Sequence, residues 1–196
     1  MPRIAALLVY PLESCRGVRV KQATASPLGL EGDRRWRVTD EVGAPVGASL
    51  LGGVYVQQLG TDVVLTAAGM ERLTLPAGMA AAEAWFTKLL GKPAKCVERP
   101  VTEAEPFLAT TTTSLVRLNQ ALPEALQIER FSSNIVLEGT TAFEEDEWTL
   151  VRMGGARFFA NRPAGTRLPF GVELRLEDGG KPVQLRAGQT LDVFKT

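Results

Sequence analysis

The chain has 196 residues, of which 45% are apolar and 22% are charged, and its 22 basic and 22 acidic residues give a formal net charge of zero. This composition is typical of a folded globular protein, and it excludes overall charge as a reason to expect nucleic acid or an anionic membrane as a partner. No apolar run approaches the roughly 20 residues that span a bilayer, so we expect no membrane-spanning segment.

The chain contains no histidine, which excludes a Ser-His-Asp triad, a Cys-His pair and every histidine-based zinc site. Catalysis would therefore need carboxylates, lysine, tyrosine, cysteine or a bound cofactor. The two cysteines, Cys15 and Cys96, do not make a disulfide framework, which favours a reduced, cytoplasmic setting. We interpret both as small buried residues, although Arg16 and Arg19 could lower the pKa of the Cys15 thiol and make it nucleophilic.

The first half of the chain is predicted to be mostly β-strand, because short apolar segments alternate with glycine and proline. The expected strands cover residues 4–10, 18–24, 34–39, 54–58, 63–66 and 73–75. A helix is expected at residues 80–90, where alanines and large apolar side chains recur with helical spacing. Gly91 stands where a C-terminal cap is needed, and Pro93 prevents the helix from continuing.

The second half is predicted to begin with a helix at residues 114–122, capped by the hydroxyl run at 110–114. Further strands are expected at residues 134–137, 148–153, 157–160, 172–176 and 191–194. The spacing of strands and turns predicts a mainly β, barrel-like α+β architecture with few short helices. The segment "RPVTEAEP" at residues 99–106 is interpreted as a linker, which divides the chain into expected domains 1–99 and 100–196.

Three polar segments are candidate sites. Arg34 could hold a phosphate or carboxylate bidentately, but a basic strand with Glu31, Asp33 and Asp40 nearby is more typical of a solvated, ion-paired face. The acidic run "FEEDEW" at 143–148 lacks the ligand spacing of a calcium loop and is typical of a solvated turn, favourable at a helix N-terminus. The pair Gly154–Gly155 predicts a hairpin turn, followed by a glycine- and proline-rich loop of the kind found at pocket mouths.

Several segments in a fixed order resemble the MOSC-domain family, and in particular its two-part members, which include the YcbX proteins and the mitochondrial amidoxime-reducing components. The matching segments are "YPLESCRGV", "GLEGDRRWRV", "PFLATTTTSLVRLN", "RFSSNIVLEG", "FEEDEWTLVRMGG" and "LRAGQTLDVF". The resemblance covers nearly the whole chain. It implies an N-terminal β-barrel region fused to a β-rich MOSC core, here shortened.

The resemblance also implies a pterin molybdenum cofactor, a cysteine thiolate on the metal, and reduction of N-hydroxylated or S-oxidised substrates. The cofactor-binding residues that it retains are Ser14, Arg34 and Asn134. Other positions depart from the family pattern. The family's cysteine positions fall on Ala164 and Arg167, its lysine on Glu13, its Thr-Ser pair on Ala104 and Glu105, and an arginine on Ser132.

These departures add two carboxylates and remove an arginine where the resemblance implies a phosphate. We therefore expect a degenerate MOSC protein without catalytic residues or a metal site, which binds an unknown small molecule or protein partner. The alternatives are an active molybdenum-cofactor oxidoreductase, with Cys15 as the internal thiol, or a carrier that holds a pterin or another phosphate-bearing molecule through Ser14, Arg34 and Asn134.

Overall fold

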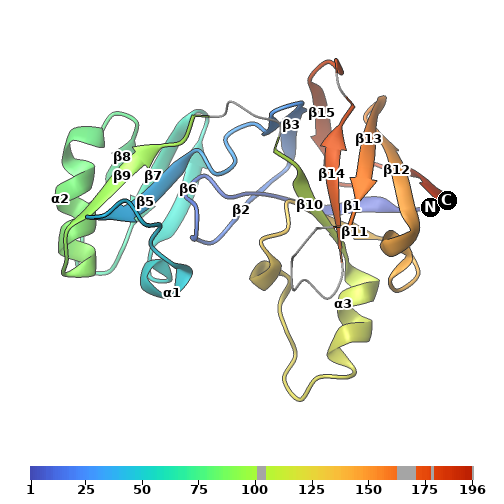
Figure 1. Ribbon diagram of the computed structural model, residues 1–196, viewed down its shortest axis with the longest axis horizontal. Coiled ribbons are helices and arrows are strands. Elements are labelled where there is room, and N and C mark those ends of the chain that lie inside the picture. Colours follow the sequence, from blue (N-terminus) through green and yellow to red (C-terminus); the bar gives the residue numbers. More distant parts are fainter. Residues whose placement is uncertain (101–104, 163–170, 178, 196) are drawn as a thin grey trace. The chain divides into compact units, whose positions relative to one another are not determined.

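The computed structural model describes residues 1–100, 105–162, 171–177 and 179–195 (Figure 1). Chain contacts divide the protein into two compact units, each built from segments that lie apart in the sequence. Unit 1 comprises Met1–Leu8, Arg19–Glu31 and Thr102–Thr196, and unit 2 comprises Val9–Val18 and Gly32–Val101. The expected division into residues 1–99 and 100–196 stays a prediction.

Most of unit 1 is an eight-stranded sheet with the order β16-β12-β13-β14-β10-β11-β1-β2. Its strands are β1 (Arg3–Val9), β2 (Val18–Val20), β10 (Phe107–Thr111), β11 (Ile135–Glu138), β12 (Trp148–Met153), β13 (Ala156–Asn161), β14 (Val172–Leu176) and β16 (Asp192–Lys195). Strands β10 and β11 run parallel, with Ala109 opposite Ile135. Ile135, Val136 and Leu137 are all buried, so both faces of β11 are covered. A continuous run of β-branched and leucine residues is suited to such a central position.

Unit 1 also contains a three-stranded sheet and short helices. The sheet has the order β15-β3-β4, formed by β15 (Val183–Arg186), β3 (Gln22–Ser26) and β4 (Gly29–Leu30). Helix α3 (Thr112–Asn119) follows β10 directly, and two 3-10 helices, η1 (Ile128–Phe131) and η2 (Glu144–Glu147), lie in the loops on either side of β11. Thr111 caps α3, because its hydroxyl accepts a hydrogen bond from the Ser114 backbone N–H at 3.2 Å.

Unit 2 has its own sheets, helices and core. Strand β5 (Trp36–Asp40) pairs with β9 (Ala94–Glu98), and β6 (Tyr55–Leu59), β7 (Asp62–Thr66) and β8 (Leu73–Leu75) form a meander. Helix α1 (Ala48–Leu51) is one turn long, whereas α2 (Met79–Leu90) packs on β8 and β9 (Figure 1). Helix α2 presents Ala82, Trp85 and Phe86 to a core that includes Trp36 and Leu65.

The mainly β prediction is confirmed, as are the helix that ends at Gly91 and the hairpin of β6 and β7. Gly91 has the left-handed φ of 66° that such a cap requires. In the part of the chain that the structure describes, the strands form four separate sheets with a linear strand order, and none closes on itself. No helix in these described residues is long and apolar enough to cross a membrane.

Some expected boundaries were wrong. Helix α3 begins at Thr112 rather than at residue 114, since Thr111 is the hydroxyl that caps it. Strand β5 begins at Trp36, so Arg34 lies in the preceding turn and not in the strand. Strand β10 was missed, because the sequence "FLATT" merges into the hydroxyl run that was assigned entirely to a helix start.

Candidate functional site

The turn that holds Ser14 lies in unit 2, beside the start of β5. The Glu13 backbone N–H donates to the Trp36 carbonyl at 2.8 Å, and the Cys15 N–H donates to the Leu12 carbonyl at 3.2 Å. Between them, half-buried Ser14 has a φ of 67°, a left-handed conformation that is uncommon for a residue other than glycine. The backbone therefore fixes this turn tightly, with Ser14 at its bend.

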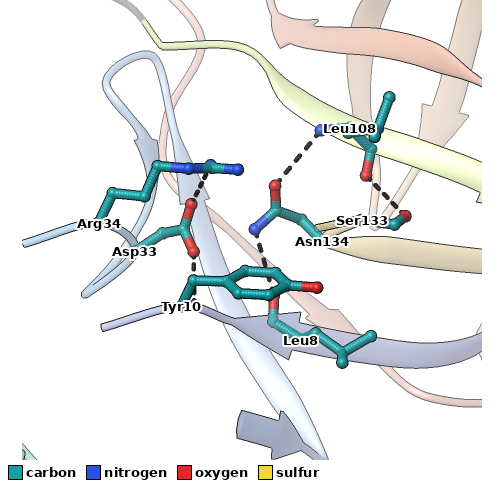
Figure 2. Close-up of polar contacts among 7 residues, drawn as sticks. All are labelled: Leu8, Tyr10, Asp33, Arg34, Leu108, Ser133 and Asn134. Carbon is teal, nitrogen blue, oxygen red and sulfur yellow. Dashed lines mark hydrogen bonds and ion pairs between the residues drawn. The ribbon is translucent and has the colours of Figure 1, made fainter. Parts of the chain in front are cut away.

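Arg34 lies against the same segment and is held by its neighbours. Its backbone N–H donates to the Tyr10 carbonyl at 2.7 Å, and its guanidinium lies 5.7 Å from the centre of the Tyr10 ring. The guanidinium forms an ion pair with Asp33, and the other oxygen of that carboxylate accepts from the Tyr10 N–H at 2.7 Å (Figure 2). The Asp33 side chain is only 7% exposed, so its carboxylate interacts with Arg34 and with the Tyr10 N–H rather than with solvent.

Two of the basic residues beside this turn are therefore neutralised from within unit 2. Arg34 pairs with Asp33, and Arg37 pairs with Glu13. A phosphate bound here would have to displace a carboxylate or lie beside one, and like charges at close range repel. Of the acidic partners expected for this basic segment, Asp33 pairs with Arg34, whereas Arg35 pairs with Glu98 and Arg37 with Glu13.

Asn134 lies in unit 1 and is fully buried. Its side-chain oxygen accepts from the Leu108 backbone N–H at 3.3 Å, and its side-chain nitrogen donates to the Leu8 carbonyl at 3.2 Å (Figure 2). Its backbone forms two further hydrogen bonds with the same two residues, at 2.9 and 2.8 Å. The Asn134 amide therefore connects the end of β1 and the start of β10 to the residue that precedes β11. This is a structural role.

Both thiols belong to the core of unit 2. Cys15 and Cys96 are free and buried, and the Cys15 Sγ lies 4.0 Å from the Leu51 carbonyl oxygen. Burial raises the pKa of each thiol to about 12, and the nearby Cys96 adds to the effect on Cys15. At neutral pH both are therefore protonated, and a buried thiol in this state is unsuited to nucleophilic attack. The interpretation as small buried residues is confirmed.

A buried carboxylate in unit 1 was missed by the sequence reasoning. The acidic run was expected to be a solvated turn, but Glu145 is 1% exposed. Its carboxylate accepts hydrogen bonds from the Ser114 hydroxyl at 2.9 Å and from the Thr111 hydroxyl at 3.1 Å, beside the N-terminus of α3. Burial raises the pKa of the Glu145 carboxyl, whereas these hydrogen bonds act in the opposite direction. The flanking Phe143 and Trp148 were the available sign that the run turns inward.

The positions that depart from the family pattern are only partly visible. Ala104, Ala164 and Arg167 lie outside the described residues. Ser132 is exposed and has a left-handed φ of 51° at the end of η1. No group of three or more histidine, cysteine, aspartate or glutamate side chains among the described residues has the arrangement of a metal site.

Two protein-family models match the chain. The first, the MOSC N-terminal beta barrel domain, matches residues 1–81, and the second, the MOSC domain, matches residues 97–175. The two matches follow one another along the chain and are separated by residues 82–96, so the expected boundary at residues 99–106 lies within the second match.

Curated relatives match over much of the chain. Human mitochondrial amidoxime reducing component 2 is 28% identical over 77% of this chain and 61% of its own length. Component 1 of Xenopus laevis is 26% identical over 79% of this chain and 61% of its own length. The chain thus spans about three fifths of the length of these relatives. A solved structure, the YUAD protein of Bacillus subtilis, is 10% identical with a TM-score of 0.51 over 100% of this chain and 97% of that chain, a likeness of fold.

Proposed function

Because this chain belongs to the MOSC-domain family, we propose that it is a non-catalytic binding member of that family, one that holds no molybdenum through a protein thiolate. The observation that carries the proposal is the state of the thiols. No cysteine follows Cys96 in this sequence, so residues 97–196, which include the MOSC match, contain none. Cys15 and Cys96 are buried, and burial raises the pKa of each to about 12.

The residues that the resemblance assigns to the cofactor do not fit it. Of the three retained positions, Arg34 is already paired with Asp33, and the amide of Asn134 is buried and bonded to backbone groups at both ends. Ser14 lies next to Glu13, whose carboxylate forms an ion pair with Arg37 and so occupies that cation as well. These contacts support a loss of phosphate binding at this turn.

A second candidate is a molybdenum-cofactor oxidoreductase that acts on N-hydroxylated or S-oxidised substrates. The observation in its favour is the similarity to proteins named mitochondrial amidoxime reducing components. In this protein such an enzyme would need either a cofactor held without a protein thiolate or a thiolate from Cys15. The second route requires the Cys15 side chain to leave the core of unit 2.

Metal and pterin analysis separates the two candidates. The full chain, expressed in a host that makes the molybdenum cofactor, is analysed for molybdenum by mass spectrometry and for pterin by fluorescence after oxidation. Human amidoxime reducing component 2, purified in parallel, serves as the positive control. A Cys15→Ala/Cys96→Ala double variant tests whether any bound metal depends on a thiol.

We expect neither molybdenum nor pterin above background in the chain or in the double variant. One molybdenum per chain that disappears in the double variant would establish a thiolate ligand and refute the proposal. One molybdenum per chain that persists in the double variant would equally refute it in favour of a cofactor-binding enzyme.

The two free cysteines also support the proposed cytoplasmic location, since oxidising compartments favour disulfides.

A further inference from the structure

Unit 1 contains a pocket that the family resemblance does not account for. It is lined by residues 154–157, from the turn that joins β12 to β13 and the start of β13, and by residues 176, 177 and 180–183. Its volume is about 350 Å³, which falls in the range of small-molecule sites. Its described lining residues include none of Ser14, Arg34, Asn134 and the two cysteines.

Two glycines that line the pocket pack closely against neighbouring atoms. A Cβ added at Gly154 would lie 2.7 Å from the Val183 side chain, and one added at Gly180 would lie 2.7 Å from the Glu177 carbonyl oxygen. The Gly180 N–H also donates to that carbonyl at 2.8 Å. Gly155 differs, because a Cβ there would meet no atom within 4 Å. The backbone at Gly154 and Gly180 is therefore closely packed, whereas Gly155 leaves open space at the pocket.

Among the described residues that line the pocket, two are cations and one is a carboxylate, which leaves one net positive charge. Arg157 forms an ion pair with Glu177 at 3.2 Å, with side chains that are 50% and 38% exposed. A guanidinium has five N–H donors, so this contact leaves others for a ligand. Lys181 is exposed, and among the described residues it has no ion-pair partner.

The rest of the lining is apolar. Leu176 is 1% exposed, and it borders the pocket together with Val183 and Pro182. The accessible apolar surface comes from exposed Pro182 and half-buried Val183. Apolar surface beside one net positive charge among the described lining residues suits a ligand that has an apolar body and a single negative charge. We propose that this pocket binds a small monocarboxylate, with its carboxylate against Arg157 and Lys181 and its apolar part against Pro182 and Val183.

The test is a titration of the full chain with benzoate at pH 7 and constant ionic strength, followed through backbone amide resonances. Benzyl alcohol and benzylamine are neutral and cationic probes of the same size, and inorganic phosphate is the other anion. Two variants remove the charge of an exposed lysine: Lys181→Gln in the pocket and Lys21→Gln on a different segment of unit 1. Gly155→Asn adds a side chain that tolerates positive φ into the open space.

We expect benzoate to shift the Gly155 and Gly180 amide resonances saturably, and both neutral and cationic probes to bind at least about fivefold more weakly. Lys181→Gln is expected to weaken benzoate about fivefold, Gly155→Asn to weaken it further, and Lys21→Gln to leave it unchanged. Equal affinities for benzoate and benzylamine, equal effects of the two lysine variants, or tighter binding of phosphate than of benzoate would each overturn the proposal.

Discussion

The two buried thiols predict a loss of stability in mildly alkaline solution. Burial raises the pKa of Cys15 and Cys96 from 9.0 to about 12. Above pH 9 the unfolded chain releases these protons while the folded chain keeps them, so the free energy of unfolding falls as pH rises towards 12. At pH 10 each thiol lies about one unit above its unfolded pKa, which corresponds to about 1.4 kcal/mol, or about 3 kcal/mol for both.

The assay compares the wild type with the Cys15→Ala/Cys96→Ala variant by urea denaturation at pH 8 and pH 10. Lysines and tyrosines also titrate in this interval, but both proteins contain them, so their contribution cancels in the difference. The variant starts from lower stability at pH 8, because each substitution removes a buried side chain. The wild type should then lose about 3 kcal/mol more than the variant between the two pH values.

An equal loss in both proteins would refute the reasoning, because it would mean that the thiols ionise as easily in the folded protein as in the unfolded one. A wild type that became more stable relative to the variant would show folded thiolates. That result would also undermine the proposed function, which depends on the absence of an available thiolate ligand.

Three further substitutions test the buried polar groups and the close packing. Asn134→Ala removes the side chain that bonds to the buried Leu108 N–H and the buried Leu8 carbonyl. It should therefore lower the free energy of unfolding, measured by urea denaturation, by about 2–5 kcal/mol. A change below about 1 kcal/mol would contradict the structural role. Because burial raises the pKa of Glu145, the stability of the wild type should decline relative to that of Glu145→Gln as pH rises from below 4.5 through the folded pKa, and parallel pH profiles would show that Glu145 is solvated. Gly78→Ala should cost about 1–3 kcal/mol, because the new methyl would lie 2.7 and 2.8 Å from neighbouring atoms. The matched Gly53→Ala, which has open space, should unfold at nearly the wild-type midpoint.

The elements that depend on local signals could be predicted from the sequence. Helix α2 follows from its alanine-rich spacing and from Gly91, and the hairpin of β6 and β7 follows from two apolar runs separated by a glycine. Strand β10 was hidden, because the same threonines serve both as strand residues and as the helix cap. Local pattern cannot separate these two uses when one directly follows the other.

The candidate site was harder to predict, because its character depends on long-range contacts. Asn134 bonds to Leu8, 126 positions earlier in the chain, and no local pattern reveals such a partner. The burial of Glu145 is accompanied by hydrogen bonds that its carboxylate accepts from hydroxyl groups 31 and 34 residues earlier in the chain. The ion pair of Arg34 with Asp33 lies between sequence neighbours, and for that reason it could be anticipated.

The interleaving of the two units has a consequence for biosynthesis. All of unit 2 lies between residues 9 and 101, so every segment of this unit has been synthesised when the first half of the chain has left the ribosome. Strand β1 is synthesised first, yet it pairs with β11, which begins at residue 135. Strand β2 lies on the other side of β1 and is available early, but the pairing of β1 with β11 must wait until all of unit 2 has been synthesised. This order makes closure of the larger sheet a late event, governed by contacts of long sequence separation.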